Sequence, residues 1–219
     1  MPDPQGPAPV NSLVRVDARH PDEAVIQRAA KGLFCNKVVI FPAACLYGVA
    51  ANALSPQAVE KVFSLKQRPK DNPILVLVKN RSMLAQLVTS IPPAAEALMQ
   101  TFWPGRLTLV FEAAAHVNPQ LTAGTGKIGI RMPGHPVARA LADAVDFPIT
   151  GTSANLSGTP GCTRPQALPR SILEQADLVL DAGEVQGGKG STIVDITQSP
   201  AVILRNGAIP DQKIFKALA

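Results

Sequence analysis

Several basic residues stand where the chain changes from one regular segment to the next. Lys66 and Arg68 lie two residues apart between a helical pattern and an apolar run, and Arg131 and Arg205 each end a strand-like run. An arginine presents a planar fork that fits phosphate or carboxylate, and a lysine adds a compact charge. These residues could bind an anionic substrate, but a solvated helix end or a surface ion pair would use the same residue types.

Two segments combine glycine with hydroxyl residues. Residues 151–158 (GTSANLSG) follow a short apolar run, and residues 187–192 (GGKGST) precede another. Backbone N–H groups in such loops can surround an anion, although each loop alone could be an ordinary turn. Neither is a P-loop or a nucleophile elbow. Many anion-binding groups and few candidate bases indicate catalysis by positioning and charge stabilisation, as in attack on a nucleotide phosphate.

Composition limits the class of protein. The 219 residues are 46% hydrophobic and 17% charged, which suits one compact domain. The net charge of +5 fits a protein that handles phosphate or RNA, and it fits many others. Cys35, Cys45 and Cys162 are too few and too scattered for a disulfide framework or a zinc site, so we expect reduced thiols and no metal ligand cluster. The absence of a long apolar run predicts a cytoplasmic protein without a membrane segment.

Hydrophobic spacing predicts alternating helices and strands. Helices are expected at residues 21–33, 55–65, 82–88, 92–101, 136–144 and 168–175. Strands are expected at residues 37–41, 73–78, 107–111, 127–131, 148–150, 178–180, 191–196 and 201–204. Ser55 is a candidate N-cap, and Tyr47-Gly48 is assigned to a loop. The pattern predicts an α/β domain around one mixed sheet over residues 16–212, with a disordered lead-in at 1–15 and a tail at 213–219.

Seven ordered segments together resemble the YrdC-type threonylcarbamoyl-AMP synthases. They are residues 42–48 (PAACLYG), 66–69 (KQRP), 102–108 (FWPGRLT), 131–133 (RMP), 153–158 (SANLSG), 190–192 (GST) and 204–207 (LRNG). The resemblance implies an open, twisted α/β sheet with flanking helices and a concave basic cavity. It also implies synthesis of threonylcarbamoyl-AMP and pyrophosphate from L-threonine, bicarbonate and ATP, for tRNA modification. Mg²⁺ bridging the phosphates, contact with tRNA and a downstream threonylcarbamoyl transferase complex would follow.

The same resemblance assigns roles to individual residues. Lys66 and Arg68 would be catalytic. The ATP-binding set would be Lys66, Arg68, Asn72, Lys127, Ser153, Asn155, Gly161 and Arg205. The threonine-binding set would be Cys45, Tyr47, Leu77, Arg131, Gly151 and Ser191.

One loop departs from the family pattern. Family members usually carry Pro-Thr-Glu-Thr after the first strand, whereas this chain has Pro42, Ala43, Ala44 and Cys45. A thiol is a weak hydrogen-bond donor, so a buried contact to the substrate is weakened at Cys45. Three interpretations remain: a synthase with a remodelled pocket, a related carbamoyl-adenylate enzyme with another acceptor, and a non-catalytic RNA-binding module.

Overall fold

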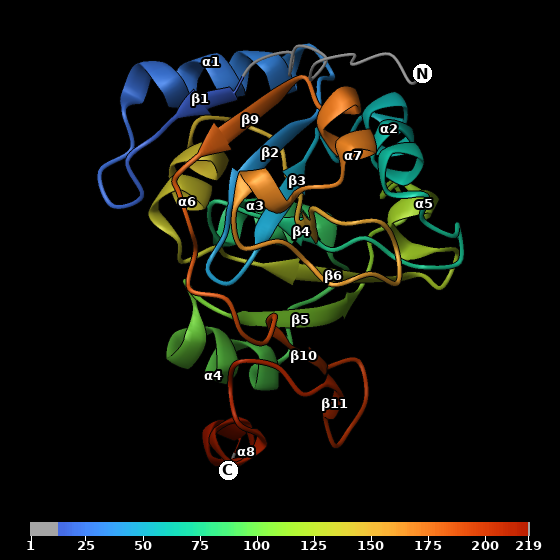
Figure 1. Ribbon diagram of the computed structural model, residues 1–219. Coiled ribbons are helices and arrows are strands. Elements are labelled where there is room, and N and C mark those ends of the chain that lie inside the picture. The colour runs from blue at the N-terminus through green and yellow to red at the C-terminus, as the bar shows by residue number, and fades with distance from the viewer. Residues whose placement is uncertain (1–12, 219) are drawn as a thin grey trace, which may run out of the picture.

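The strands form two open mixed sheets rather than one (Figure 1). The computed structural model describes residues 13–218. In spatial order the first sheet contains β1 (Leu13–Arg15), β9 (Leu178–Asp181), β2 (Val39–Pro42), β3 (Tyr47–Ala50) and β8 (Thr152–Ser153). The second sheet contains β11 (Val202–Arg205), β10 (Thr192–Asp195), β5 (Leu107–Glu112), β6 (Lys127–Arg131), β4 (Val76–Leu77) and β7 (Ile149–Thr150).

Both sheets combine parallel and antiparallel pairs, as the short connections predict. In the first sheet β9 runs parallel to β1 and β2, and β3 runs antiparallel to β2 and β8. In the second sheet β5 pairs antiparallel with β6 and parallel with β10. The expected open mixed α/β architecture is confirmed, but the expectation of a single sheet is wrong. Alternation along the chain does not reveal which strands pair, and here the chain changes sheets between neighbouring strands.

Helices cover both sheets. They are α1 (Glu23–Phe34), α2 (Pro56–Lys66), α3 (Arg81–Leu87), α4 (Pro93–Phe102), α5 (Pro119–Thr122), α6 (Pro136–Asp143), α7 (Arg170–Gln175) and α8 (Asp211–Leu218), with a 3₁₀ turn at Pro165–Ala167. The Asp22 side chain caps α1 by accepting from the N–H groups of Ala24 and Val25. Ser55 caps α2 through the Ala58 N–H at 3.2 Å, which confirms the predicted N-cap.

Two apolar clusters hold these layers together. Helices α1 and α6 pack on one face of the first sheet, where Phe41 and Leu180 are buried against them. The larger cluster joins the other face of that sheet to the second sheet, with α2, α3 and α4 contributing buried side chains. No helix within residues 13–218 has the length and apolar character needed to cross a membrane.

The structure corrects three sequence assignments. Tyr47-Gly48 begins strand β3 instead of lying in a loop, because its backbone pairs with β2. Residues 13–15, which we assigned to the lead-in, pair with β9, and residues 1–12 lie outside the described residues. Residues 211–218 form α8, which packs on α4 and buries Ile214, so the segment assigned as a tail joins the core.

The chain passes from the second sheet to the first at Gly151, which separates β7 from β8. The Gly151 N–H donates to the Leu75 carbonyl at 3.0 Å. A Cβ at this position would lie 2.7 Å from Leu75 Cδ1 and 2.8 Å from Leu77 Cδ2, closer than atoms can pack. A larger residue would force the Leu75 and Leu77 side chains to shift, so glycine suits the point where the two sheets meet. The candidate site opens beside this crossing.

Candidate functional site

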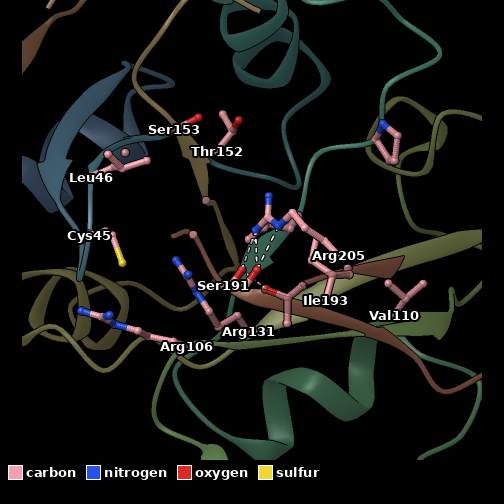
Figure 2. Close-up of a pocket in the computed structure, with 18 of the residues that line it drawn as sticks. Cys45, Leu46, Arg106, Val110, Arg131, Thr152, Ser153, Ser191, Ile193 and Arg205 are labelled. Carbon is pink, nitrogen blue, oxygen red and sulfur yellow. Dashed lines mark hydrogen bonds between the residues drawn. The ribbon is translucent and has the colours of Figure 1, made fainter. Parts of the chain in front are cut away.

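A cavity of about 490 Å³ lies where the β2–β3 turn, the sheet crossing and the ends of β6, β10 and β11 meet. Its lining comes from segments far apart in the chain, and Figure 2 shows several of these side chains facing the same space. The charged residues of the lining are Arg68, Arg106, Lys127, Arg131, Arg205 and Asp195. Cationic groups therefore outnumber carboxylates in this lining.

Among the described residues, Arg131 is a lining cation with an unsatisfied side-chain donor. It ends β6, opposite Leu77 of β4, and its Nε is buried without a hydrogen-bond partner among the described residues. Burial, and secondarily the charge of Arg205, lower the pKa of Arg131 to about 10. A buried guanidinium with an unused donor is costly unless an anion pairs with it. Arg131 can therefore hold a carboxylate.

Arg205 is held in place by Ser191. Its Nε and one terminal nitrogen donate to the Ser191 carbonyl at 3.0 and 2.7 Å, and the same terminal nitrogen donates to Ser191 Oγ at 3.0 Å (Figure 2). Ser191 Oγ lies 2.8 Å from Thr108 Oγ1 and shares a hydrogen bond with it. Burial lowers the pKa of Arg205. These bonds fix one edge of the guanidinium and direct it along the cavity wall.

Arg68 and Arg106 are fixed by backbone carbonyls. Arg68 donates to the Asn72 carbonyl at 3.0 Å, to Asn72 Oδ1 at 3.3 Å and to the Pro73 carbonyl at 2.8 Å. Burial lowers the pKa of Arg68. Arg106 donates to the Ala44 carbonyl at 3.2 Å and to the side chain of Gln186. Neutral acceptors orient both side chains and leave their charge available to an anion.

Lys127 and Asp195 form an ion pair at 3.0 Å. Burial alone would raise the pKa of Asp195, but hydrogen bonds from Thr197, Gln198 and Lys127 lower it to about 2. Asp195 Oδ1 accepts from Thr197, and Oδ2 accepts from Lys127 and Gln198. Both carboxylate oxygens are therefore already used.

Lys66 lies behind the cavity wall rather than in the lining. It is only 1% exposed, and its Nζ donates to the carbonyls of Ser153 and Asn155 and to Asn155 Oδ1. Burial, and secondarily the charge of Arg68, lower the pKa of Lys66 to about 8. In this arrangement Lys66 shapes the turn after β8 and thereby positions Ser153, which faces the cavity.

The β2–β3 turn is tied to the loop at residues 183–190. The Cys45 thiol donates to the Lys189 carbonyl at 2.9 Å, and the Cys45 carbonyl accepts from the Gly187 N–H at 3.1 Å. The Tyr47 hydroxyl donates to the Gly183 carbonyl at 2.7 Å and accepts from the Ala182 N–H at 3.0 Å. Burial raises the pKa of Tyr47 to about 12, so the phenol stays protonated at neutral pH.

Most of the residues selected from the sequence meet at this cavity. The lining contains Cys45, Tyr47, Arg68, Lys127, Arg131, Gly151, Ser153, Ser191 and Arg205. The others, Lys66, Asn72, Leu77, Asn155 and Gly161, are not in the lining but contact residues that are. A Cβ at Gly161, for example, would lie 2.6 Å from Leu46 Cδ1, so this glycine lets the loop approach the β2–β3 turn.

Five polar lining residues were not selected from the sequence, and two of them are Thr125 and Thr152. The other three are Arg106, Thr108 and Asp195. Arg106 and Thr108 lie within the FWPGRLT segment, which we used only to establish the resemblance. Asp195 is a single carboxylate at the end of β10, and a single carboxylate gives no pattern of spacing. A search for polar residues at predicted strand ends would have found all three.

Comparison with known proteins identifies the family. The model of the Sua5/YciO/YrdC family, described as "Telomere recombination", matches residues 33–207. The chain belongs to the Sua5/YciO/YrdC family. Within it, the threonylcarbamoyl-AMP synthase of Pyrococcus abyssi (strain GE5 / Orsay) is 36% identical over 197 residues, which cover 90% of this chain and 58% of the relative. The threonylcarbamoyl-AMP synthase of Bacillus subtilis (strain 168) is 38% identical over 190 residues, which cover 86% of this chain and 55% of the relative.

The chain thus spans little more than half the length of these two family members. A Methanocaldococcus jannaschii relative matches over its whole length instead, with 31% identity covering 94% of this chain and 98% of the relative. Among solved structures of the Sua5/YciO/YrdC family, P. abyssi Sua5 complexed with L-threonine superposes with a TM-score of 0.90 at 36% identity. The match covers 95% of this chain and 61% of that one.

Proposed function

We propose that this chain is a nucleotidyltransferase that makes threonylcarbamoyl-AMP and pyrophosphate from L-threonine, bicarbonate and ATP. The observation that carries the proposal is the meeting of Arg68, Arg131 and Arg205 in one cavity, where the buried Arg131 Nε has no hydrogen-bond partner within residues 13–218. The cavity is thus suited to several anionic groups at once. The relatives named threonylcarbamoyl-AMP synthase, and the related structure that binds L-threonine, support the same reaction.

In this proposal ATP and threonine occupy different walls. Arg68, Lys127, Ser153 and Arg205 contact the nucleotide, while Lys66, Asn72, Asn155 and Gly161 hold the segments that carry them. Arg131 binds the threonine carboxylate. Ser191, the Gly151 backbone, Cys45 and Tyr47 surround the rest of the amino acid, and Leu77 supports Gly151 from behind.

The chemistry requires positioning and charge stabilisation more than acid–base groups. The neutral threonine amine attacks bicarbonate carbon, forms the N–C bond and releases water to give a carbamate. A carbamate oxygen then attacks the α-phosphorus, the bond from that phosphorus to the bridging oxygen breaks, and pyrophosphate leaves. Negative charge accumulates on the carbamate and the phosphoryl oxygens, where Arg68, Arg131 and Arg205 stabilise it.

Mg²⁺ is expected to arrive with the ATP phosphates rather than to occupy a protein site. Both oxygens of Asp195, the carboxylate in the lining, already accept hydrogen bonds. Within residues 13–218 no group of three or more His, Cys, Asp or Glu residues could hold a metal ion. The steps above use only the side chains of the chain itself.

The reaction can be tested directly by mixing the chain with labelled bicarbonate, L-threonine, ATP and Mg²⁺. We expect label in threonylcarbamoyl-AMP together with an equal amount of pyrophosphate, identified by chromatography and mass spectrometry. A related synthase provides the positive control. Pyrophosphate without labelled adenylate, or no product at all, would contradict the proposal.

The wider setting is part of the same proposal. The product would be passed in the cytoplasm to a transferase complex that modifies tRNA, with direct tRNA contact supported by the net charge of +5. A second candidate is synthesis of a related carbamoyl adenylate from another amino acid. It is favoured by one observation, the presence of Ala43, Ala44 and Cys45 in the cavity lining.

A further inference from the structure

The side-chain end of the amino-acid site is poor in free hydrogen-bonding groups. Ala43, Ala44 and Cys45 form its wall on the β2–β3 turn, and Figure 2 shows the Cys45 thiol pointing toward the guanidinium of Arg131. The two alanine side chains offer only methyl groups. The contribution of Cys45 therefore decides whether this wall recognises a hydroxyl.

The amino acid is anchored beside this wall. If its carboxylate pairs with the Arg131 guanidinium, its Cβ lies within about 3 Å of the carboxylate carbon, because only the Cα separates them. Cys45 and Arg131 both line the cavity, and the thiol faces the guanidinium in Figure 2. The substrate side chain therefore contacts Cys45 and the neighbouring methyl groups.

The Cys45 thiol has no donor left for a substrate hydroxyl. Its single hydrogen points to the Lys189 carbonyl at 2.9 Å, and thiol sulfur is only a weak acceptor. Arg106 on the same wall uses one terminal nitrogen for the Ala44 carbonyl and the Gln186 side chain, so that nitrogen is directed to the protein. A substrate methyl group would fit here as well as a hydroxyl does.

We infer that this site selects its amino acid by size rather than by the side-chain hydroxyl, and that Cys45 is the residue responsible. This inference rests on the proposed function. It assigns the acceptor to the class of small L-α-amino acids, with valine and 2-aminobutyrate used alongside threonine. Sites that hydrogen-bond a substrate hydroxyl reject the analogue without it by about 10⁴-fold, whereas apolar pockets discriminate far less.

The test compares amino acids by the kcat/KM of ATP-dependent pyrophosphate release, with the labelled adenylate confirmed for each. We expect kcat/KM for L-threonine to exceed that for L-valine by less than about thirtyfold. A larger ratio would overturn the inference and leave the proposed function intact. Release with neither L-threonine nor any other amino acid would overturn both.

A one-atom substitution tests the role of Cys45. A serine hydroxyl at this position can still donate to the Lys189 carbonyl, but its oxygen accepts hydrogen bonds far better than sulfur. Cys45→Ser is therefore expected to raise the threonine-to-valine ratio by about two- to tenfold. Cys45→Thr, which adds the same hydroxyl with a methyl group, is a second variant and should change the ratio in the same direction.

Cys162 supplies a matched control. Its thiol also donates to a carbonyl, that of Ala167 at 3.1 Å, but it does not line the cavity. Cys162→Ser should leave the ratio unchanged. A general loss of stability would lower both kcat/KM values together, so only the ratio reports on specificity. An unchanged ratio in both Cys45 variants, or an equal change in Cys162→Ser, would overturn the assignment to Cys45.

Discussion

Replacing Arg131 by methionine should separate substrate binding from stability. In the part of the chain that the structure describes, the buried Nε of Arg131 has no hydrogen-bond partner, and Arg131 lies near the charge of Arg205. In the free protein this guanidinium is therefore a burden, because the desolvation of an unpaired charge is not compensated. In the complex it would form charge-assisted hydrogen bonds to the substrate carboxylate. Arg131→Met removes both effects while keeping a long, unbranched side chain.

The two effects have opposite signs and can be measured apart. Loss of the charge-assisted bonds should cost about 3 kcal/mol of binding, which corresponds to about a 150-fold rise in the KM for L-threonine. The free energy of unfolding should stay the same or rise by about 1–4 kcal/mol, as when other unpaired or poorly paired buried charges are replaced by apolar groups.

Pyrophosphate release against L-threonine concentration gives the first quantity, and urea unfolding gives the second. Arg139→Met is the control, because Arg139 pairs with Asp143 at 2.9 Å on α6 and does not line the cavity. It should leave KM unchanged. An unchanged KM in Arg131→Met, or a marked loss of its stability, would refute the reasoning that Arg131 is reserved for an anion.

Three further substitutions test the framework of the site. Asp195 has a pKa of about 2 in the folded chain, below its ordinary value of 3.8. The ionised carboxylate therefore stabilises the fold by about 2 kcal/mol above pH 3.8, and this contribution disappears as the pH falls from 3.8 through 2. In Asp195→Asn the free energy of unfolding, measured with urea from neutral to acidic pH, should not show this loss. If the free energy of unfolding falls in parallel with pH in the variant and the unmodified protein, the reasoning is refuted. Gly151→Ala should cost about 1–3 kcal/mol of stability and most activity, since its Cβ would lie 2.7 Å from Leu75 Cδ1. The control is Gly32→Ala, whose new Cβ would have its nearest neighbour at 3.8 Å and which should stabilise α1 by about 0.5–1 kcal/mol. An equal loss of stability in Gly151→Ala and Gly32→Ala would contradict the steric argument. Tyr47→Phe removes the hydrogen bonds to the Gly183 carbonyl and the Ala182 N–H and should lower the free energy of unfolding by about 1–3 kcal/mol, so an unchanged urea midpoint would count against the tie to the 183–190 loop.

Local signals made much of the fold predictable. The helix after Ser55 follows from its N-cap and the spacing of its apolar residues, and the strands at 107–111 and 127–131 follow from their alternation. Non-local contacts were not accessible in the same way. Strand β3 depends on pairing with β2 and β8, and α8 depends on burying Ile214 next to α4. The expected strand at 73–78 shortens to Val76–Leu77, because only these residues pair with β6 and β7.

Residue type predicted which side chains gather near the cavity better than it predicted how they act there. Arg131 and Lys66 are both cations at the ends of regular elements. Arg131 lines the cavity and has a buried donor without a partner among the described residues, whereas Lys66 donates to three oxygen atoms behind the cavity wall. That difference depends on where the turn after β8 passes, which spacing along the chain does not encode. Asp195 escaped notice for the same reason, because its partner Lys127 lies on another strand.

A crystal structure with a non-hydrolysable ATP analogue and L-threonine tests the central claim most directly. The account predicts the threonine carboxylate on the Arg131 guanidinium and the nucleotide phosphates between Arg68 and Arg205, all within the one cavity. It also predicts no direct contact between the phosphates and Lys66. Ligands bound elsewhere on the surface, or an Arg131 that still faces no anion in the complex, would contradict it.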